Sequence, residues 1–176
     1  MPKSPPPQPA AVLARVLRVS TFEGRTVLVI GAAGGLLSAL LGDWFGAVVG
    51  ALVAGAGAVE LHGGQLLRLG QSRGMNWLVR SQLLLGNTIL LYCAIRLLST
   101  SVASLDAQMT PDIRSALSQS GMGVKDIEVL AVKLYRLVYT IVAVVTLLYQ
   151  GGMALYYHRR RKIVTEGLTT APAALP

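Results

Sequence analysis

Histidines, acids and a cysteine are the side chains that could bind a metal ion or support acid–base catalysis in this sequence. The chain has 2 histidines, His62 and His158, together with 8 acidic residues and 1 cysteine, Cys93. One cysteine excludes an intramolecular disulfide and a cysteine-based zinc or iron–sulfur site. Glu60 and His62 are close in sequence, but a spacing of two residues points them about 200° apart on a helix. We therefore expect no catalytic site, no metal ion and no cofactor.

The stretch from Glu60 to Gln82, which we call the elbow, is the best candidate for specific recognition, because it is the one concentrated polar and basic break inside a very apolar sequence. Its sequence, ELHGGQLLRLGQSRGMNWLVRSQ, interrupts long apolar runs on both sides. The residues that could contact a lipid headgroup or a partner protein are Glu60, His62, Arg68, Arg73 and Arg80. Glu60 could also pair with Arg80 across the elbow. The simpler alternative is that these charges only mark the border of two membrane spans.

The apolar runs around the elbow predict transmembrane helices. Hydrophobic residues make up 53% of the 176 residues and charged residues only 14%, whereas soluble domains carry about 25% charged residues. The predicted spans, each close to the length that a bilayer requires, are 26–41, 44–60, 77–99 and 131–157. We therefore predict an all-α, polytopic membrane protein in which residues 26–157 form a four-helix transmembrane domain.

The segments outside the spans are short. Residues 1–25 are a Pro-rich tail and a basic juxtamembrane segment, in which 11–22 is either an amphipathic helix on the membrane surface or a charged flank of the first span. Residues 158–176 are predicted to be a basic and then disordered cytoplasmic tail. In the loop before the last span, Thr110-Pro111-Asp112 predicts the start of a short amphipathic helix on the outer surface.

Charge placement predicts the orientation of the spans. Basic residues exceed acids in the N-terminal flank, in the elbow and after Tyr157, whereas acids exceed basic residues in the 100–129 loop. The positive-inside rule then places both termini in the cytoplasm, N-in and C-in, at the inner membrane if the chain is bacterial. In this orientation both histidines lie on the cytoplasmic side and all aspartates lie on the outer side. This separation argues against a Ser-His-Asp triad. The net charge of +8 is divided among membrane borders, so we expect no nucleic acid as partner.

Small residues in the first two spans repeat every four positions. The repeats are Gly31, Gly35 and Ala39 in the first span, and Gly46, Gly50 and Ala54 in the second. This spacing puts small side chains on one helix face and favours close helix packing. The contact is either between these two spans within one chain or with another molecule.

Polar residues inside the spans are few. Asn87 and Thr88 fall near the middle of the third span, whereas no acid, lysine or histidine falls at the middle of any predicted span. An ion-coupled transporter usually needs such a residue. We expect a small, non-enzymatic integral membrane protein that acts through helix packing, as an assembly factor, adaptor or accessory subunit. Its partners would be the lipid bilayer and another membrane protein or a second copy. The alternative is a small channel or transporter formed by oligomerisation of the Gly-rich hairpin.

Overall fold

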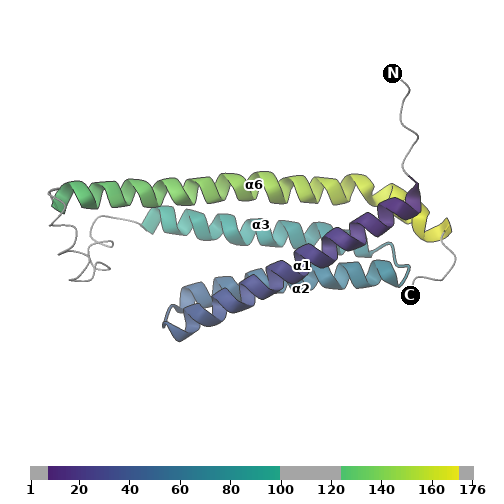
Figure 1. The fold of residues 1–176 in the computed structure, drawn as a ribbon, viewed down its shortest axis with the longest axis horizontal. Helices are drawn as coiled ribbons and strands as arrows, with labels where there is room; N and C mark the ends of the chain where they lie inside the picture. The colour runs from purple at the N-terminus through teal and green to yellow at the C-terminus, as the bar shows by residue number, and fades with distance from the viewer. Residues whose placement is uncertain (1–7, 100–123, 171–176) are drawn as a thin grey trace, which may run out of the picture. The chain divides into compact units, whose positions relative to one another are not determined.

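All the regular structure of the described residues is helical. The computed structural model describes residues 8–99 and 124–170. The helices in this part of the chain are α1 (Pro9–Leu40), α2 (Trp44–Arg68), α3 (Gly74–Ser99) and α6 (Val124–Thr170) (Figure 1). All four are long and apolar enough to cross a membrane. This confirms the prediction of an all-α fold with four candidate membrane spans, while the predicted helix that starts at Thr110 lies outside the described residues.

The chain divides into two compact units. One unit comprises residues up to Ile89 together with those from Leu147 onward, and the other comprises residues 90–146. In the second unit, three tyrosines gather between α3 and α6. The ring of Tyr139 lies 5.9 Å from that of Tyr92 and 4.5 Å from that of Tyr135. The Arg96 Nε donates a hydrogen bond of 3.2 Å to the Tyr92 hydroxyl, so this cation is held among the tyrosines.

In the first unit, α1 and α2 form a hairpin with a tight turn (Figure 1). Helix α1 ends where Gly42 adopts a φ of 78°, which a glycine tolerates because it has no Cβ. The N–H of Gly42 donates to the Ala39 carbonyl at 3.1 Å, and the N–H of Asp43 donates to the Ser38 carbonyl at 2.8 Å. This bonding pattern satisfies the last carbonyls of α1. Asp43 then caps α2 by accepting from the N–H of Gly46 at 2.9 Å.

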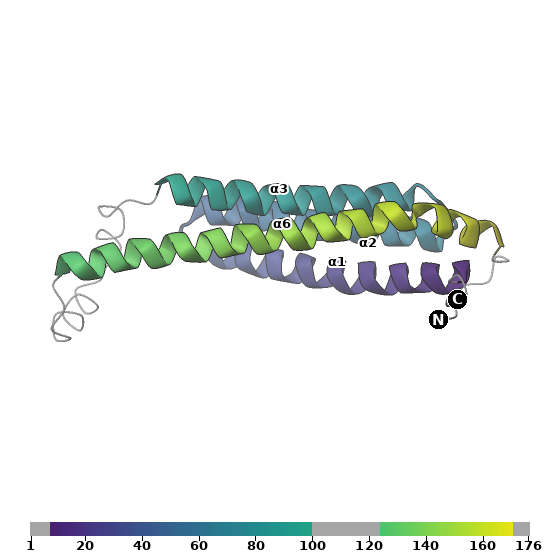
Figure 2. The ribbon, with the colours of Figure 1, turned by 90° about the horizontal axis from the view of Figure 1, so that it is seen from above.

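Glycines bring the backbones of α1 and α2 into direct contact, and the two helices lie side by side in both views (Figures 1 and 2). A Cβ on Gly31 would lie 2.5 Å from the nitrogen of Ala54, and one on Gly57 would lie 2.5 Å from the nitrogen of Leu28. Gly35 and Gly50 face each other in the same seam. The small residues that repeat every four positions therefore meet within one chain.

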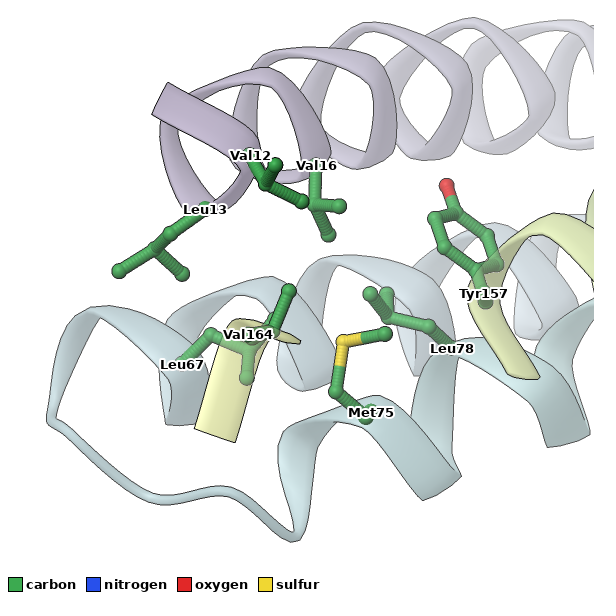
Figure 3. Packing of buried hydrophobic residues seen from close by; sticks show 8 residues of the cluster. All are labelled: Val12, Leu13, Val16, Leu67, Met75, Leu78, Tyr157 and Val164. Carbon is green, nitrogen blue, oxygen red and sulfur yellow. The ribbon is translucent and has the colours of Figure 1, made fainter. Parts of the chain in front are cut away.

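The helices of the first unit continue past the predicted spans into a packed cluster, which we call the end core. Its members come from all four helices and are Val12, Leu13, Val16, Leu67, Met75, Leu78, Tyr157 and Val164 (Figure 3). A helix as long as α1, with its 32 residues, spans about 48 Å, whereas the hydrocarbon core of a bilayer is only about 30 Å thick. Helix α1 is therefore longer than such a core is thick.

Two segments outside the predicted spans take part in the end core. Residues 11–22 were predicted to be either an amphipathic helix on a membrane surface or a flank of the first span. They continue α1 without a break, as a flank does, and several of their apolar side chains pack in the end core. Residues 163–170, which were expected to be disordered, continue α6 to Thr170. The physical reason is burial: Val164 has no exposed surface and belongs to the end core. A Cβ on Gly167 would lie 2.9 Å from the Pro9 carbonyl oxygen, so the last turns of α6 also contact the start of α1.

Candidate functional site

The elbow is the end of α2, a five-residue loop and the start of α3. The loop is closed by Gly70, which has a φ of 75°. The N–H of Gly70 donates to the Leu67 carbonyl at 3.0 Å, and the N–H of Gln71 donates to the Leu66 carbonyl at 2.9 Å. This is the same helix ending as at Gly42. The loop therefore fixes how α2 and α3 leave the elbow.

The candidate recognition residues of the elbow do not form one site. His62 and Arg80 are exposed and contact one tryptophan: the His62 ring lies 5.4 Å from the Trp77 ring, and the Arg80 guanidinium carbon lies 5.7 Å from its centroid. Arg68 donates a hydrogen bond of 3.0 Å to the Thr21 hydroxyl of α1. Arg73 donates one of 2.7 Å to the Gln71 side chain within the loop.

Glu60, the fifth candidate, is turned into the bundle and is only 1% exposed. Its Oε1 accepts a hydrogen bond of 3.1 Å from the Gln82 amide and one of 2.9 Å from the Tyr157 hydroxyl. The expected pairing of Glu60 with Arg80 is therefore not formed. The reason is helix geometry: Glu60 faces the other helices, whereas Arg80 faces outward, so the carboxyl has its partners inside the bundle.

A second glutamate, Glu23 of α1, lies beside Glu60 and is 7% exposed. Its carboxyl is next to the Glu60 carboxyl, the Gln82 amide and the Tyr149 hydroxyl. Although these groups are close, neither Glu23 oxygen receives a hydrogen bond of good geometry, and the Gln82 Oε1 is also buried without one. We call Glu23, Glu60, Gln82, Tyr149 and Tyr157 the glutamate cluster. It draws on all four helices.

Glycines on three helices allow the glutamate cluster to form. A Cβ on Gly24 would lie 3.2 Å from the Gly57 carbonyl oxygen, so α1 and α2 are close at the level of Glu23. A Cβ on Gly74 would lie 2.5 Å from the Gly63 carbonyl oxygen, which brings α3 against α2 just beyond Glu60. Tyr157 connects the end core with the glutamate cluster. Its ring packs in the end core (Figure 3), and its hydroxyl donates a hydrogen bond to Glu60. Close backbones leave the two carboxyls little room for water.

The chemistry available to the glutamate cluster is the binding of a positive charge. Both carboxyls are buried, and within residues 8–99 and 124–170 no basic side chain acts on either of them. Burying an uncompensated carboxylate costs free energy, and the usual remedy is a proton or a cation. Within the same described ranges, no third histidine, cysteine, aspartate or glutamate joins the pair to form a metal-binding group.

Sequence reasoning did not find the glutamate cluster because it counted Glu23 only as one acid against the basic N-terminal flank. A signal was nevertheless present. Glu23 directly precedes Gly24, and Glu60 lies three residues from both Gly57 and Gly63. An acid next to small residues that mark a packing face is an acid that folding will bury.

An open groove runs along α1 on the same unit, with a volume of about 860 Å³. Its lining includes three apolar side chains and three arginines, namely Leu13, Leu17, Phe22, Arg18, Arg25 and Arg68. Arg68, a candidate from the elbow, is thus joined by two arginines of α1. A lining that combines apolar side chains with several cations suits an anionic amphiphile in both polarity and charge.

Asn87 and Thr88 differ although they are neighbours. Thr88 is buried and donates to the Leu84 carbonyl of its own helix at 2.8 Å. Asn87 lies at the middle of α3 and is exposed, as are Leu83 and Leu84 one turn before it. Within the described residues it forms no hydrogen bond through its side chain. The Asn87 carboxamide is therefore open to the surroundings of α3.

Comparison with known proteins adds no family to this description. No protein-family model matches the chain, and neither a curated protein nor a solved structure does.

Proposed function

We propose that this chain is a non-enzymatic integral membrane protein, an assembly factor, adaptor or accessory subunit that packs against a helix of another membrane protein. The observation that carries this proposal is the exposed Asn87 at the middle of α3. A carboxamide in contact with hydrocarbon is unfavourable, and a hydrogen bond across a helix pair is worth about 1 kcal/mol in a membrane. A second helix with a polar group opposite Asn87 would satisfy it.

The alternative is a small channel or transporter formed by oligomerisation of the Gly-rich hairpin. It has less support, because Gly31, Gly50 and Gly57 already contact the other helix of the same hairpin. A channel lined by Asn87 from several copies would place the same residue against a second copy. The identity of the molecule that contacts Asn87 therefore separates the two functions.

The proposed topology has both termini in the cytoplasm, and in a bacterium the protein would lie in the inner membrane. Exposed basic residues at the end of the unit that carries the elbow support this orientation; they include Arg15, Arg18, Arg68, Arg73, Arg80, Arg159, Arg161 and Lys162. Basic residues are retained on the cytoplasmic side of membranes. The groove with Arg18, Arg25 and Arg68 is then a contact for an anionic lipid headgroup on that side.

The proposal is tested by purifying the tagged chain from native membranes after mild cross-linking. The variant Asn87→Leu keeps the size of the side chain and removes the carboxamide. We expect it to lose the co-purifying membrane protein, whereas the control Thr88→Val should retain it, because the Thr88 hydroxyl is satisfied by its own helix. Retention of the partner by Asn87→Leu would contradict the role of Asn87. A cross-linked species with twice the mass of the chain would favour the channel.

A further inference from the structure

We infer that Glu23 and Glu60 form a proton-binding site, in which the two buried carboxyls share one exchangeable proton and couple its presence to the packing of the four helices. This goes beyond the proposed function and does not depend on it, because it concerns the interior of the bundle and not its partner. The ligand is a proton from water, which the two carboxyls hold between them.

The hydrogen-bonding groups of the glutamate cluster do not balance without an added proton. Glu60 accepts from Gln82 and Tyr157. Both oxygens of Glu23 and the Oε1 of Gln82 are buried acceptors without a hydrogen bond. Gln82 is 1% exposed and its amide nitrogen already binds Glu60, so its free oxygen is held inside the cluster. A proton on either carboxyl supplies a missing donor, because protonated Glu60 can donate to a Glu23 oxygen and protonated Glu23 can donate to Glu60 or to this amide oxygen.

The surroundings of the two carboxyls assign the proton to the pair and not to one residue. Glu60 accepts two hydrogen bonds, which favour its charged form, but it is only 1% exposed, and burial favours its neutral form. Glu23 is 7% exposed and accepts no hydrogen bond of good geometry. Two carboxyls in contact titrate as a unit, so the proton belongs to both.

Charged and titratable groups that face the pair are few. Helix α6 contributes the hydroxyls of Tyr149 and Tyr157, and α3 contributes the neutral Gln82. Within the part of the chain that the structure describes, no cationic side chain acts on either glutamate. Loss of the shared proton would leave two adjacent negative charges in a buried site, which opposes the close contact of α1 with α2.

The position of the pair along the helices follows from the length of α2. Glu60 is 16 residues along α2 from the exposed Trp44, which corresponds to about 24 Å at 1.5 Å per residue. With Trp44 at one membrane interface and a hydrocarbon core of about 30 Å, the glutamates lie near the opposite interface, on the side of the elbow.

A metal cation is the competing ligand for the same oxygens. Hard cations such as Ca²⁺ take about 6–8 oxygen ligands in proteins. The glutamate cluster offers two carboxyls and one amide oxygen, and the amide nitrogen and the Tyr157 hydroxyl are already turned toward Glu60 as donors. This arrangement suits a proton better, and the metal becomes an outcome of the experiment.

The test is infrared difference spectroscopy of the full chain in lipid nanodiscs, titrated from about pH 5 to about pH 9. We expect a carbonyl band of a buried protonated carboxyl in the parent chain, which disappears as the pH rises. The band should be lost or shifted in both Glu23→Gln and Glu60→Gln, while the control Glu166→Gln, on an exposed residue, should leave it unchanged. Absence of a titrating band from the parent chain would overturn the inference, even if no variant could be purified.

Thermal unfolding over the same pH range supplies the second readout. The folded chain holds a proton that an unfolded glutamate releases at neutral pH, so a higher pH should lower the unfolding temperature of the parent chain. The double variant Glu23→Gln, Glu60→Gln should lose this dependence and stay stable at high pH. Identical pH profiles for the parent and the double variant would overturn the inference. Stabilisation of the parent chain, but not of the double variant, by Na⁺ or Ca²⁺ at high pH would assign the site to a cation instead.

Discussion

The glycine seam between α1 and α2 gives a sharp prediction from two glycines on one helix. A Cβ on Gly57 would lie 2.5 Å from the Leu28 nitrogen and 2.7 Å from the Gly24 carbonyl oxygen, whereas a Cβ on Gly55 would have no atom within 4 Å. Both positions are inside α2. The variants Gly57→Ala and Gly55→Ala therefore make the same chemical change on the same helix, inside and outside the seam.

The expected magnitudes follow from these distances. Replacing a helical glycine by alanine stabilises a helix by about 0.5–1 kcal/mol, and Gly55→Ala should gain this amount. Gly57→Ala gains it as well, but ordinary contacts between heavy atoms lie at about 3.5–4.0 Å, so α1 and α2 must separate by about 1 Å. Overpacking of this kind costs about 1–3 kcal/mol. We expect Gly57→Ala to be less stable than Gly55→Ala by the full overpacking cost.

The assay is reversible unfolding in bicelles, measured for both variants and the parent chain. The free energy of unfolding should fall for Gly57→Ala and rise slightly for Gly55→Ala. Equal shifts in the same direction would refute the packing of α1 on α2, because helix propensity alone would then explain both results.

Three further predictions concern the end core and the groove. Leu67→Ala should lower the free energy of unfolding by about 2–5 kcal/mol, whereas Leu69→Ala should change it little, since Leu67 is fully buried and Leu69 is 65% exposed. Truncation after Lys162 removes the buried Val164 and should lower the unfolding temperature; an unchanged temperature would mean that residues 163–170 do not pack on α1. Arg68→Lys should weaken the binding of an anionic phospholipid in native mass spectrometry, because lysine lacks the planar fork that holds a phosphate, while Arg73→Lys, outside the groove, should bind as the parent does.

The sequence was sufficient to predict the helices because long apolar helices carry a strong local signal. Apolar runs predicted where the four helices lie. The four-residue repeat that includes Gly31 and Gly50 identified a packing face. It left the partner of that face open, because spacing along one helix does not say which helix lies opposite. The partner is defined only by the three-dimensional contact of Gly31 with Ala54.

The end core could not be predicted in the same way. The apolar residues Val12, Leu13 and Val16 have the pattern of a helix on a membrane surface, and the same pattern suits a helix in a bundle. The difference lies in Val164, which is about 150 residues away in sequence and packs in the same cluster. Contacts over such a separation leave no local pattern in one sequence.

The glutamate cluster was missed for a related reason. Counting charges on each side of a membrane treats every acid as an exposed charge, and Glu23 and Glu60 were counted in this way. Their burial depends on Gln82 and Tyr157, which come from two other helices. The neighbouring glycines indicate a packing face, but only the fold shows which groups surround each carboxyl.

The most direct measurement of the proposed function is photo-cross-linking in native membranes from a photoreactive amino acid placed at position 87. The proposal predicts one dominant adduct between this chain and a different membrane protein, with no such adduct from the same probe at Leu52, an exposed residue on α2. Adducts with lipid alone would contradict a partner helix at Asn87, and a dominant adduct between two copies of this chain would contradict the accessory-subunit function in favour of an oligomeric channel.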